Sequence, residues 1–261
     1  MILDQIVAEK RREQKRRFPV AMDELWARIE GLAPARPFAA SLRQPNVPQK
    51  PGALRVIAEF KRRSPSAGDI RLDADVATVG RAYEKAGAAA MSILTDAKFF
   101  GGSMDDLKRV RGAARLPLLR KDFLLDERDL IDARLAGADA VLLIVRILDA
   151  RTLSALLRNA RECGLAALVE AHSDAEIEAA LAAGAEIIGV NHRDLDTLAV
   201  DLTLSARARS LAPEAILVAE SGIQTRAHIA LMREHQVDAI LVGESLMRAS
   251  DPAAALQALI A

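Results

Sequence analysis

Eight short apolar runs, each ending in a polar or charged residue, recur along this chain and constrain its fold more than any other feature. Most consist of Val, Ile, Leu and Ala without strict alternation, which is typical of parallel strands buried on both faces. The runs are Leu54–Phe60, Ala89–Thr95, Leu116–Leu119, Ala140–Val145, Ala166–Val169, Ile187–Val190, Ile216–Ala219 and Ala239–Val242.

Segments with helical periodicity separate these runs, so strand and helix alternate along the chain. Three of the helical segments end in a glycine before the next strand, where a left-handed residue stops a helix. Eight alternations suit the ~250 residues of a (β/α)8 TIM barrel, the α/β fold that we predict. A doubly wound sheet is the alternative, but no Gly-x-Gly-x-x-Gly follows the first strand. The helical segments include Asp75–Lys85, Asp126–Leu135, Leu153–Cys163 and Asp174–Ala183, and the glycines are Gly87, Gly137 and Gly184.

Residues 1–52 precede the first strand and are not needed for a barrel. We therefore expect an N-terminal helical extension packed on a barrel of residues 53–261, in one structural domain overall. A helical stripe of apolar residues opens the extension, and five prolines between Gly31 and Gly52 predict an extended strap. The stripe consists of Ile2, Leu3, Ile6 and Val7.

Six basic residues crowd the segment from Lys10 to Arg17. A basic run suggests nucleic-acid binding, but Glu9 and Glu13 interrupt this one and no aromatic side chains interleave. We interpret it as a solvated helix face.

Composition excludes several classes of partner. Thirty-six basic and 36 acidic residues give a formal net charge of zero, so no long-range field gathers nucleic acid or an anionic membrane. No apolar run approaches the length of a membrane span, and the first residues lack the order of a secretory signal. The single cysteine, Cys163, fits a reducing cytoplasm. Nothing marks an interface, so a monomer is the default expectation, and a partner from the same pathway is compatible with the sequence.

In a (β/α)8 barrel, function lies at the carboxyl ends of the strands. Side chains two apart on a strand point the same way, which sends Glu59 and Lys61 into the mouth together and pairs Lys121 with Phe123. The same argument pairs Asn191 with Arg193, and Glu170 ends another strand. Lysines beside carboxylates have shifted pKa values, so one group can donate a proton while another accepts one. The planar guanidinium of Arg193 suits a substrate carboxylate.

Two glycine-containing segments close the pattern, one after each of the last two strands. Ser221 and Gly222 follow the seventh run, and Gly243 and Glu244 follow the eighth. Glycines let a phosphate approach the backbone, and the N–H groups at a short helix start hold its charge. We predict a phosphate site here. The loop over residues 62–70 contains Pro65 and Gly68, and we expect it to close over the ligand.

A metal site is not expected. His172 and His192 could act with Glu170 as ligands, but no His-x-x-x-His pair or cysteine partner supports them. His228 and His235 are interpreted as exposed helix residues. Asp96 and Asp122 are interpreted as loop caps or as partners of the mouth residues.

Taken in order along the chain, these motifs together resemble the indole-3-glycerol phosphate synthase family. The likeness runs from the first residues to the last and includes the apolar stripe of the extension. The segments that carry it are Glu59–Ser66, Ser92–Thr95, Leu119–Phe123, Val169–Glu170, Asn191–Leu195, Ala219–Ile223 and Val242–Met247.

The resemblance implies a step of tryptophan biosynthesis that uses no cofactor. In this step, 1-(2-carboxyphenylamino)-1-deoxyribulose 5-phosphate closes a ring and loses carbon dioxide and water. By the same resemblance, Lys121 is the general acid, Glu170 the acid–base partner for dehydration, and Glu59 a positioning group. Lys61 meets the charged groups of the substrate, and the resemblance leaves open how proton transfer is divided between Lys61 and Lys121. The resemblance further implies anthranilate-side contacts from Ser64, Phe123, Asn191 and Arg193, and a phosphate cradle of Ser221, Gly222, Gly243 and Glu244.

Two other functions use part of the same pattern. An aldose–ketose isomerase acting on a phosphosugar, such as phosphoribosylanthranilate isomerase, also needs a phosphate site with an acid and a base. We would expect Cys or Asp at its strand ends rather than two lysines and two glutamates. A noncatalytic barrel that binds phosphoesters is the third possibility, and intact Lys121 and Glu170 argue against it.

Overall fold

The computed structural model describes residues 2–43, 54–194 and 197–260. Within them, eight parallel strands close into a barrel, which confirms the predicted (β/α)8 fold and excludes the doubly wound sheet. Each strand pairs with its neighbours in the order of the chain, and β1 closes the ring against the last strand. The strands are β1 (Arg55–Phe60), β4 (Ala90–Leu94), β5 (Leu118–Lys121), β6 (Ala140–Ile144), β7 (Ala166–Ala171), β8 (Ile187–Asn191), β9 (Ile216–Glu220) and β10 (Ala239–Val242).

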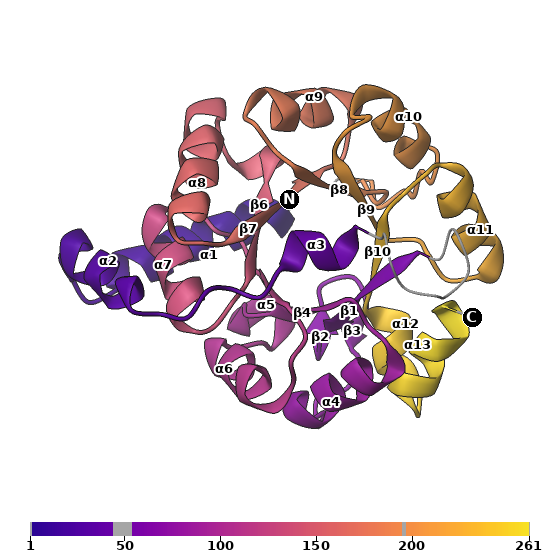
Figure 1. The fold of residues 1–261 in the computed structure, drawn as a ribbon, viewed down its shortest axis with the longest axis horizontal. Coiled ribbons are helices and arrows are strands. Elements are labelled where there is room, and N and C mark those ends of the chain that lie inside the picture. The colour runs from indigo at the N-terminus through magenta and orange to yellow at the C-terminus, as the bar shows by residue number, and fades with distance from the viewer. Residues whose placement is uncertain (1, 44–53, 195–196, 261) are drawn as a thin grey trace.

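Helices surround the barrel, as Figure 1 shows. Six of them begin after an Asp, Ser or Thr whose side-chain oxygen accepts a backbone N–H of the first turn, as N-caps do. The predicted stop glycines Gly87, Gly137 and Gly184 all have φ near +90°. The outer helices are α4 (Val76–Ala86), α6 (Met104–Ala113), α7 (Glu127–Leu135), α8 (Ala150–Glu162), α9 (Asp174–Ala182), α10 (Leu204–Leu211), α11 (Arg226–Glu234) and α13 (Pro252–Ile260).

Shorter elements lie in the loops at the carboxyl ends of the strands. They are the hairpin β2 (Arg63–Ser64) with β3 (Gly68–Asp69), the helices α5 (Ala97–Phe100) and α12 (Glu244–Arg248), and the 3-10 turn η1 (Val145–Ile147). The expected loop over residues 62–70 is thus a small hairpin. No helix among the described residues is long and apolar enough to cross a membrane.

Several strands reach further than the apolar runs predict. The run Leu116–Leu119 is displaced: β5 begins at Leu118, after Pro117, which has no N–H for the strand ladder, and it extends to Lys121. Strands β7, β8 and β9 likewise include Glu170, Asn191 and Glu220. These polar side chains therefore lie on strands rather than loops, and the hydrogen-bonded strand backbone holds them rigidly.

The described part of the extension reaches both ends of the barrel. It forms α1 (Ile2–Arg16), α2 (Met22–Glu30) and α3 (Phe38–Leu42). Phe38 and Leu42 of α3 are buried in one cluster with inward residues of the barrel such as Ile57 and Ala90, so α3 closes the amino-terminal end (Figure 1). Helix α2 packs on α7, where Trp26 donates to Glu127 at 2.7 Å.

Two expectations for the extension need correction. The segment from Gly31 to Gly52 is not an extended strap throughout, because α3 lies within it; its residues 44–52 fall outside the described part of the chain. The basic segment is not simply a solvated face either. Lys10 is buried, with its Nζ 2.8 Å from Asp96 and 3.0 Å from Asp122, and Arg17 pairs with Asp129. A buried lysine needs such carboxylates. Both lie in loops more than eighty residues further along the chain, so the local sequence around Lys10 does not reveal them.

Candidate active site

A cavity of about 440 Å³ opens at the carboxyl ends of the barrel strands. All twelve residues that the sequence marks for the site line it: Glu59, Lys61, Ser64, Lys121, Phe123, Glu170, Asn191, Arg193, Ser221, Gly222, Gly243 and Glu244. Leu142, Ile144 and Leu241 form apolar parts of its lining, and Ile2, Leu3 and Ile6 of α1 form another. The cavity therefore combines a charged floor with apolar surface.

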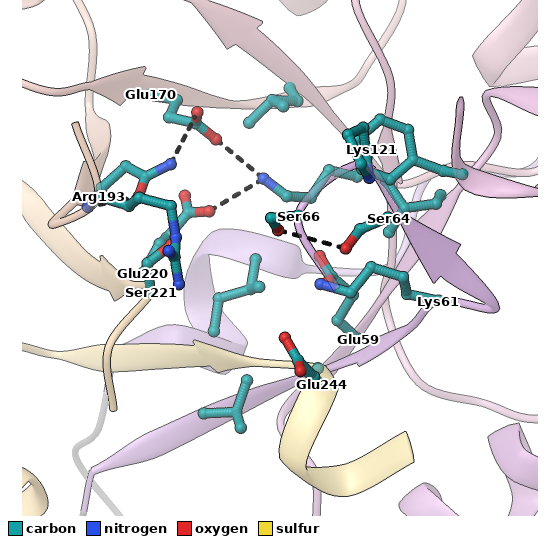
Figure 2. Close-up of a pocket in the computed structure, with 18 of the residues that line it drawn as sticks. Glu59, Lys61, Ser64, Ser66, Lys121, Glu170, Arg193, Glu220, Ser221 and Glu244 are labelled. Carbon is teal, nitrogen blue, oxygen red and sulfur yellow. Dashed lines mark hydrogen bonds and ion pairs between the residues drawn. The ribbon is translucent and has the colours of Figure 1, made fainter. Parts of the chain in front are cut away.

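Lys121 connects two carboxylates at the centre of this cavity. Its Nζ lies 2.9 Å from Glu170 Oε2 and 3.0 Å from Glu220 Oε2, as the dashed lines in Figure 2 show. Burial alone would lower the pKa of Lys121, but the negative charges of Glu170 and Glu220 outweigh it and raise that pKa. The ammonium group thus keeps its proton at neutral pH.

Glu220 is the residue of this cluster that the sequence analysis did not select. Burial raises the pKa of Glu220 to about 7; Lys121 opposes the rise and the charge of Glu170 adds to it. Only Gly189 on the neighbouring strand leaves room for it, since a Cβ there would lie 2.4 Å from Glu220 Oε1. The sequence signal that could have found Glu220 is strand alternation. Val218 points into the barrel, so Glu220, two residues further along the same strand, points into the mouth.

Glu170 has the opposite character. Burial would raise its pKa, but Lys121 and His172 outweigh this and lower it well below the ordinary range. Asn191 Nδ2 donates to Glu170 Oε1 at 3.2 Å, and Asn191 Oδ1 accepts the backbone N–H of Arg193. Two carboxylates about one lysine thus differ in pKa, the arrangement that acid–base catalysis uses.

Glu59 and Lys61 form a second pair on β1 and just beyond it. Lys61 Nζ lies 2.8 Å from Glu59 Oε1, which confirms that the two side chains share the mouth. Gly243 makes room for this pair, since a Cβ there would lie 2.5 Å from Glu59 Oε1. In Figure 2 this pair and Lys121 border the same space, with Ser64 and Ser66 of the hairpin beside them.

The two glycine segments face the cavity beside these pairs. Ser221 and Gly222 have φ of 65° and 76°, two successive left-handed residues that turn the chain sharply after β9. Behind this turn, His192 Nδ1 lies 3.0 Å from the Ser221 carbonyl oxygen and its Nε2 lies 2.6 Å from Ser205 Oγ. Gly243 precedes α12, and Glu244 pairs with Arg248 within that helix at 2.9 Å.

The histidines differ from their sequence interpretation. The described residues hold no group of His, Cys, Asp and Glu that could bind a metal ion. His192 is a buried structural contact, and His172 is buried against Glu170. His228 and His235 are half-buried rather than exposed, and His235 follows the end of α11. Asp96 caps α5, as expected of a loop cap.

Comparison with known proteins agrees with this geometry. A family model described as indole-3-glycerol phosphate synthase matches residues 3–259. The chain belongs to this family. It is 45% identical to indole-3-glycerol phosphate synthase 2 of Streptomyces coelicolor over 99% of this chain and 98% of that protein. It is 44% identical to the indole-3-glycerol phosphate synthase of Roseiflexus castenholzii over 96% and 94%.

Family membership makes the chain a carboxy-lyase of tryptophan biosynthesis. A thiamine phosphate pyrophosphorylase from Pyrococcus furiosus is similar in fold alone, with a TM-score of 0.60 at 19% identity, covering 80% of this chain and 94% of that one. The barrel fold alone therefore does not identify an activity, which must be argued from the residues of the site.

Proposed function

We propose that the Lys121 cluster carries out ring closure, decarboxylation and dehydration of 1-(2-carboxyphenylamino)-1-deoxyribulose 5-phosphate, without a cofactor. The observation that carries this assignment is the ammonium group of Lys121 within 3.0 Å of two carboxylates of different character. One cavity also holds the Glu59–Lys61 pair and both glycine segments.

Ring closure requires an acid. As the aryl carbon attacks the ketone carbon, the carbonyl oxygen gains negative charge and becomes strongly basic. A lysine with a raised pKa gives up its proton only to such an oxygen, which suits Lys121 to this step. Carbon dioxide then leaves the ring carbon. The electrons of the broken bond restore the aromatic ring and neutralise the positive charge that the ring shares with the nitrogen.

Dehydration requires a base and an acid together. The new hydroxyl group leaves as water after it is protonated, and the adjacent ring CH2, formerly C1 of the ribulose chain, loses a proton, so that the double bond of the indole forms while the nitrogen keeps its hydrogen. Glu170, ionised because its pKa is low, accepts this carbon-bound proton, while Glu59 and Lys61 orient and assist the departing oxygen. Glu220, with a pKa of about 7, can return a proton to Lys121 between turnovers.

Binding uses the two sides of the cavity. Ser221, Gly222, Gly243 and Glu244 provide backbone N–H groups for the phosphate, as successive left-handed residues and a helix start can. Arg193 meets the carboxylate of the anthranilate ring, Asn191 and Ser64 contact its polar edge, and Phe123 packs on its face. Closure of the β2–β3 hairpin would exclude water.

Three further expectations belong to this proposal. Residues 1–52 and 53–261 act as one structural domain, because α1 lines the cavity and α3 closes the opposite end. The enzyme works in the cytoplasm, where a buried, unpaired Cys163 stays reduced. It works as a monomer, because one chain supplies every residue of the site.

The test is formation of indole-3-glycerol phosphate by the purified chain, followed by indole fluorescence. Lys121→Ala and Glu170→Gln should each lower kcat by a factor on the order of 10² to 10⁴, as loss of an acid or a base does. Lys108→Ala, an exposed lysine, is the matched control. An isomerase would instead convert phosphoribosylanthranilate, and a noncatalytic barrel would bind the substrate without turnover; either result refutes the proposal.

A further inference from the structure

His172 stands immediately behind the catalytic floor and has no part in the steps above. It follows Ala171, the last residue of β7, and its ring contacts Glu170, two residues before it. Its side chain is fully shielded from solvent, with an exposed fraction of 0%. A buried imidazole needs partners for both ring nitrogens.

Both partners are carboxylates. His172 Nδ1 lies 3.1 Å from Glu176 Oε2, and Nε2 lies 3.2 Å from Glu170 Oε1. The first contact is a hydrogen bond; the second is an ion pair in which the N–H does not point squarely at the oxygen. A neutral imidazole would set a bare nitrogen lone pair against one of the two carboxylates, so the surroundings favour the doubly protonated imidazolium.

Glu176 is itself held on two sides. Its Oε2 also accepts the backbone N–H of His172 at 2.8 Å, and its Oε1 accepts from Arg146 Nε of η1 at 3.0 Å. Its backbone N–H donates to Ser173 Oγ, the N-cap of α9. A connected series of charges therefore runs from Arg146 through Glu176 and His172 to Glu170.

We propose that His172 is a positioning residue for Glu170: it fixes the carboxylate from behind and supplies a positive charge that Lys121 alone does not. This inference rests on the proposed role of Glu170 as proton acceptor. When Lys121 donates its proton during ring closure, it becomes neutral and stops stabilising the Glu170 carboxylate. The imidazolium of His172 remains, so Glu170 stays ionised for the dehydration step that follows.

The charges around His172 are consistent with this role. Burial lowers the pKa of His172, but Glu170 and Glu176 outweigh it and raise that pKa to about 9. The groups that face His172 are these two carboxylates, from β7 and α9; Arg146 lies beyond Glu176, and Lys121 lies beyond Glu170. The imidazolium form therefore holds through the neutral range.

The experiment compares His172→Gln with the parent chain over pH 5 to 9. Once Lys121 has given up its proton, a chain without the His172 charge has no cation beside Glu170, so the pKa of Glu170 rises in that state and kcat should fall about tenfold at pH 7. The acidic limb of the profile of kcat against pH should move to higher pH by at least one unit, while KM changes less than twofold. Glu176→Gln, which keeps an acceptor for Nδ1–H, should shift the limb in the same direction by less. His228→Gln is the matched control. Parental kcat, or a loss equal at every pH with the limb unmoved, would overturn the proposal.

A second measurement does not depend on turnover. The chain has four histidines, so His172→Gln identifies the His172 signal in ¹⁵N-histidine NMR spectra of the full chain. The signal should titrate well above pH 8 in the parent and at a lower pH in Glu170→Gln. An ordinary His172 pKa, or one that Glu170→Gln leaves unchanged, would refute the coupling even in an active enzyme. Coupling found in a chain without synthase activity would instead refute only the proposed function.

Discussion

The two ends of the barrel interior carry opposite kinds of side chain on the same strands. Near the amino-terminal end of β1, inward Ile57 packs in a wholly apolar cluster with Phe38 and Leu42 of α3. Two residues further along the same strand, inward Glu59 pairs with Lys61 in the cavity. The amino-terminal end is therefore apolar and contributes to stability, whereas the carboxyl-terminal end holds a charge cluster whose burial is unfavourable and which we assign to chemistry.

The amino-terminal end offers the largest stability effect. Phe38→Ala removes a side chain that is 1% exposed, and we expect it to lower the free energy of unfolding by about 3–5 kcal/mol. The kcat of the folded fraction should stay within about twofold of the parent. Chemical denaturation and initial rates on one preparation measure both quantities. Phe18→Ala, which truncates a side chain 79% exposed, should change neither.

A large loss of kcat from the folded Phe38→Ala enzyme would break the comparison between the two ends. It would mean that the apolar end also sets the geometry of the charged end.

The close contact between Gly189 and Glu220 sharpens the comparison at the charged end. Gly189→Ala places a Cβ 2.4 Å from Glu220 Oε1, so the carboxylate must move away from Lys121. We expect about a tenfold loss of kcat and about 1–3 kcal/mol of destabilisation by overpacking. Gly112→Ala, with open space at its Cβ in helix α6, should leave kcat unchanged and not destabilise the fold.

A double variant checks the cause. With Glu220→Ala also present, Gly189→Ala should cost much less stability than it does alone, because the clashing atom is gone. Equal costs in both backgrounds would place the strain elsewhere.

The remaining effect is a pH dependence of stability that His172 contributes. Its pKa is raised to about 9 in the folded state, above the ordinary 6.5. The contribution is therefore fully present below pH 6.5 and is lost as the pH rises through about 9. The unfolding free energies of the parent and His172→Gln should differ by on the order of 3 kcal/mol at pH 6 and converge by pH 10. A difference that stays constant with pH would contradict the imidazolium assignment.

The fold and most of the charged residues at the strand ends could be predicted because both depend on local periodicity. The apolar runs mark strands, and side chains two apart near a strand end share the mouth, as Glu59 with Lys61 confirms. The burial of Lys10 and the contact of His172 with Glu176 could not be predicted. The burial of Lys10 depends on a carboxylate from a distant loop, and the contact of His172 depends on the rotamers of both side chains. Local sequence periodicity predicts neither.

Glu220 illustrates a different kind of failure. The strand parity that placed Lys121 would also have placed it, but its apolar run ends at Ala219, and only Ser221 and Gly222 beyond that run were selected, as phosphate ligands. Strand β9 ends one residue later than its apolar run, so Glu220 lies on the strand and lines the cavity.

The measurement that tests the contrast between the two ends most directly is the stability of the triple variant Lys121→Met, Glu170→Gln, Glu220→Gln. A buried ion cluster replaced by neutral groups of similar size is often neutral or stabilising, whereas removal of one partner alone is costly. We therefore predict a folded, inactive enzyme that unfolds at a denaturant concentration no lower than the parent. A triple variant that fails to fold, or that loses more than about 2 kcal/mol of stability, would show that these charges hold the barrel together, and it would contradict their assignment to chemistry alone.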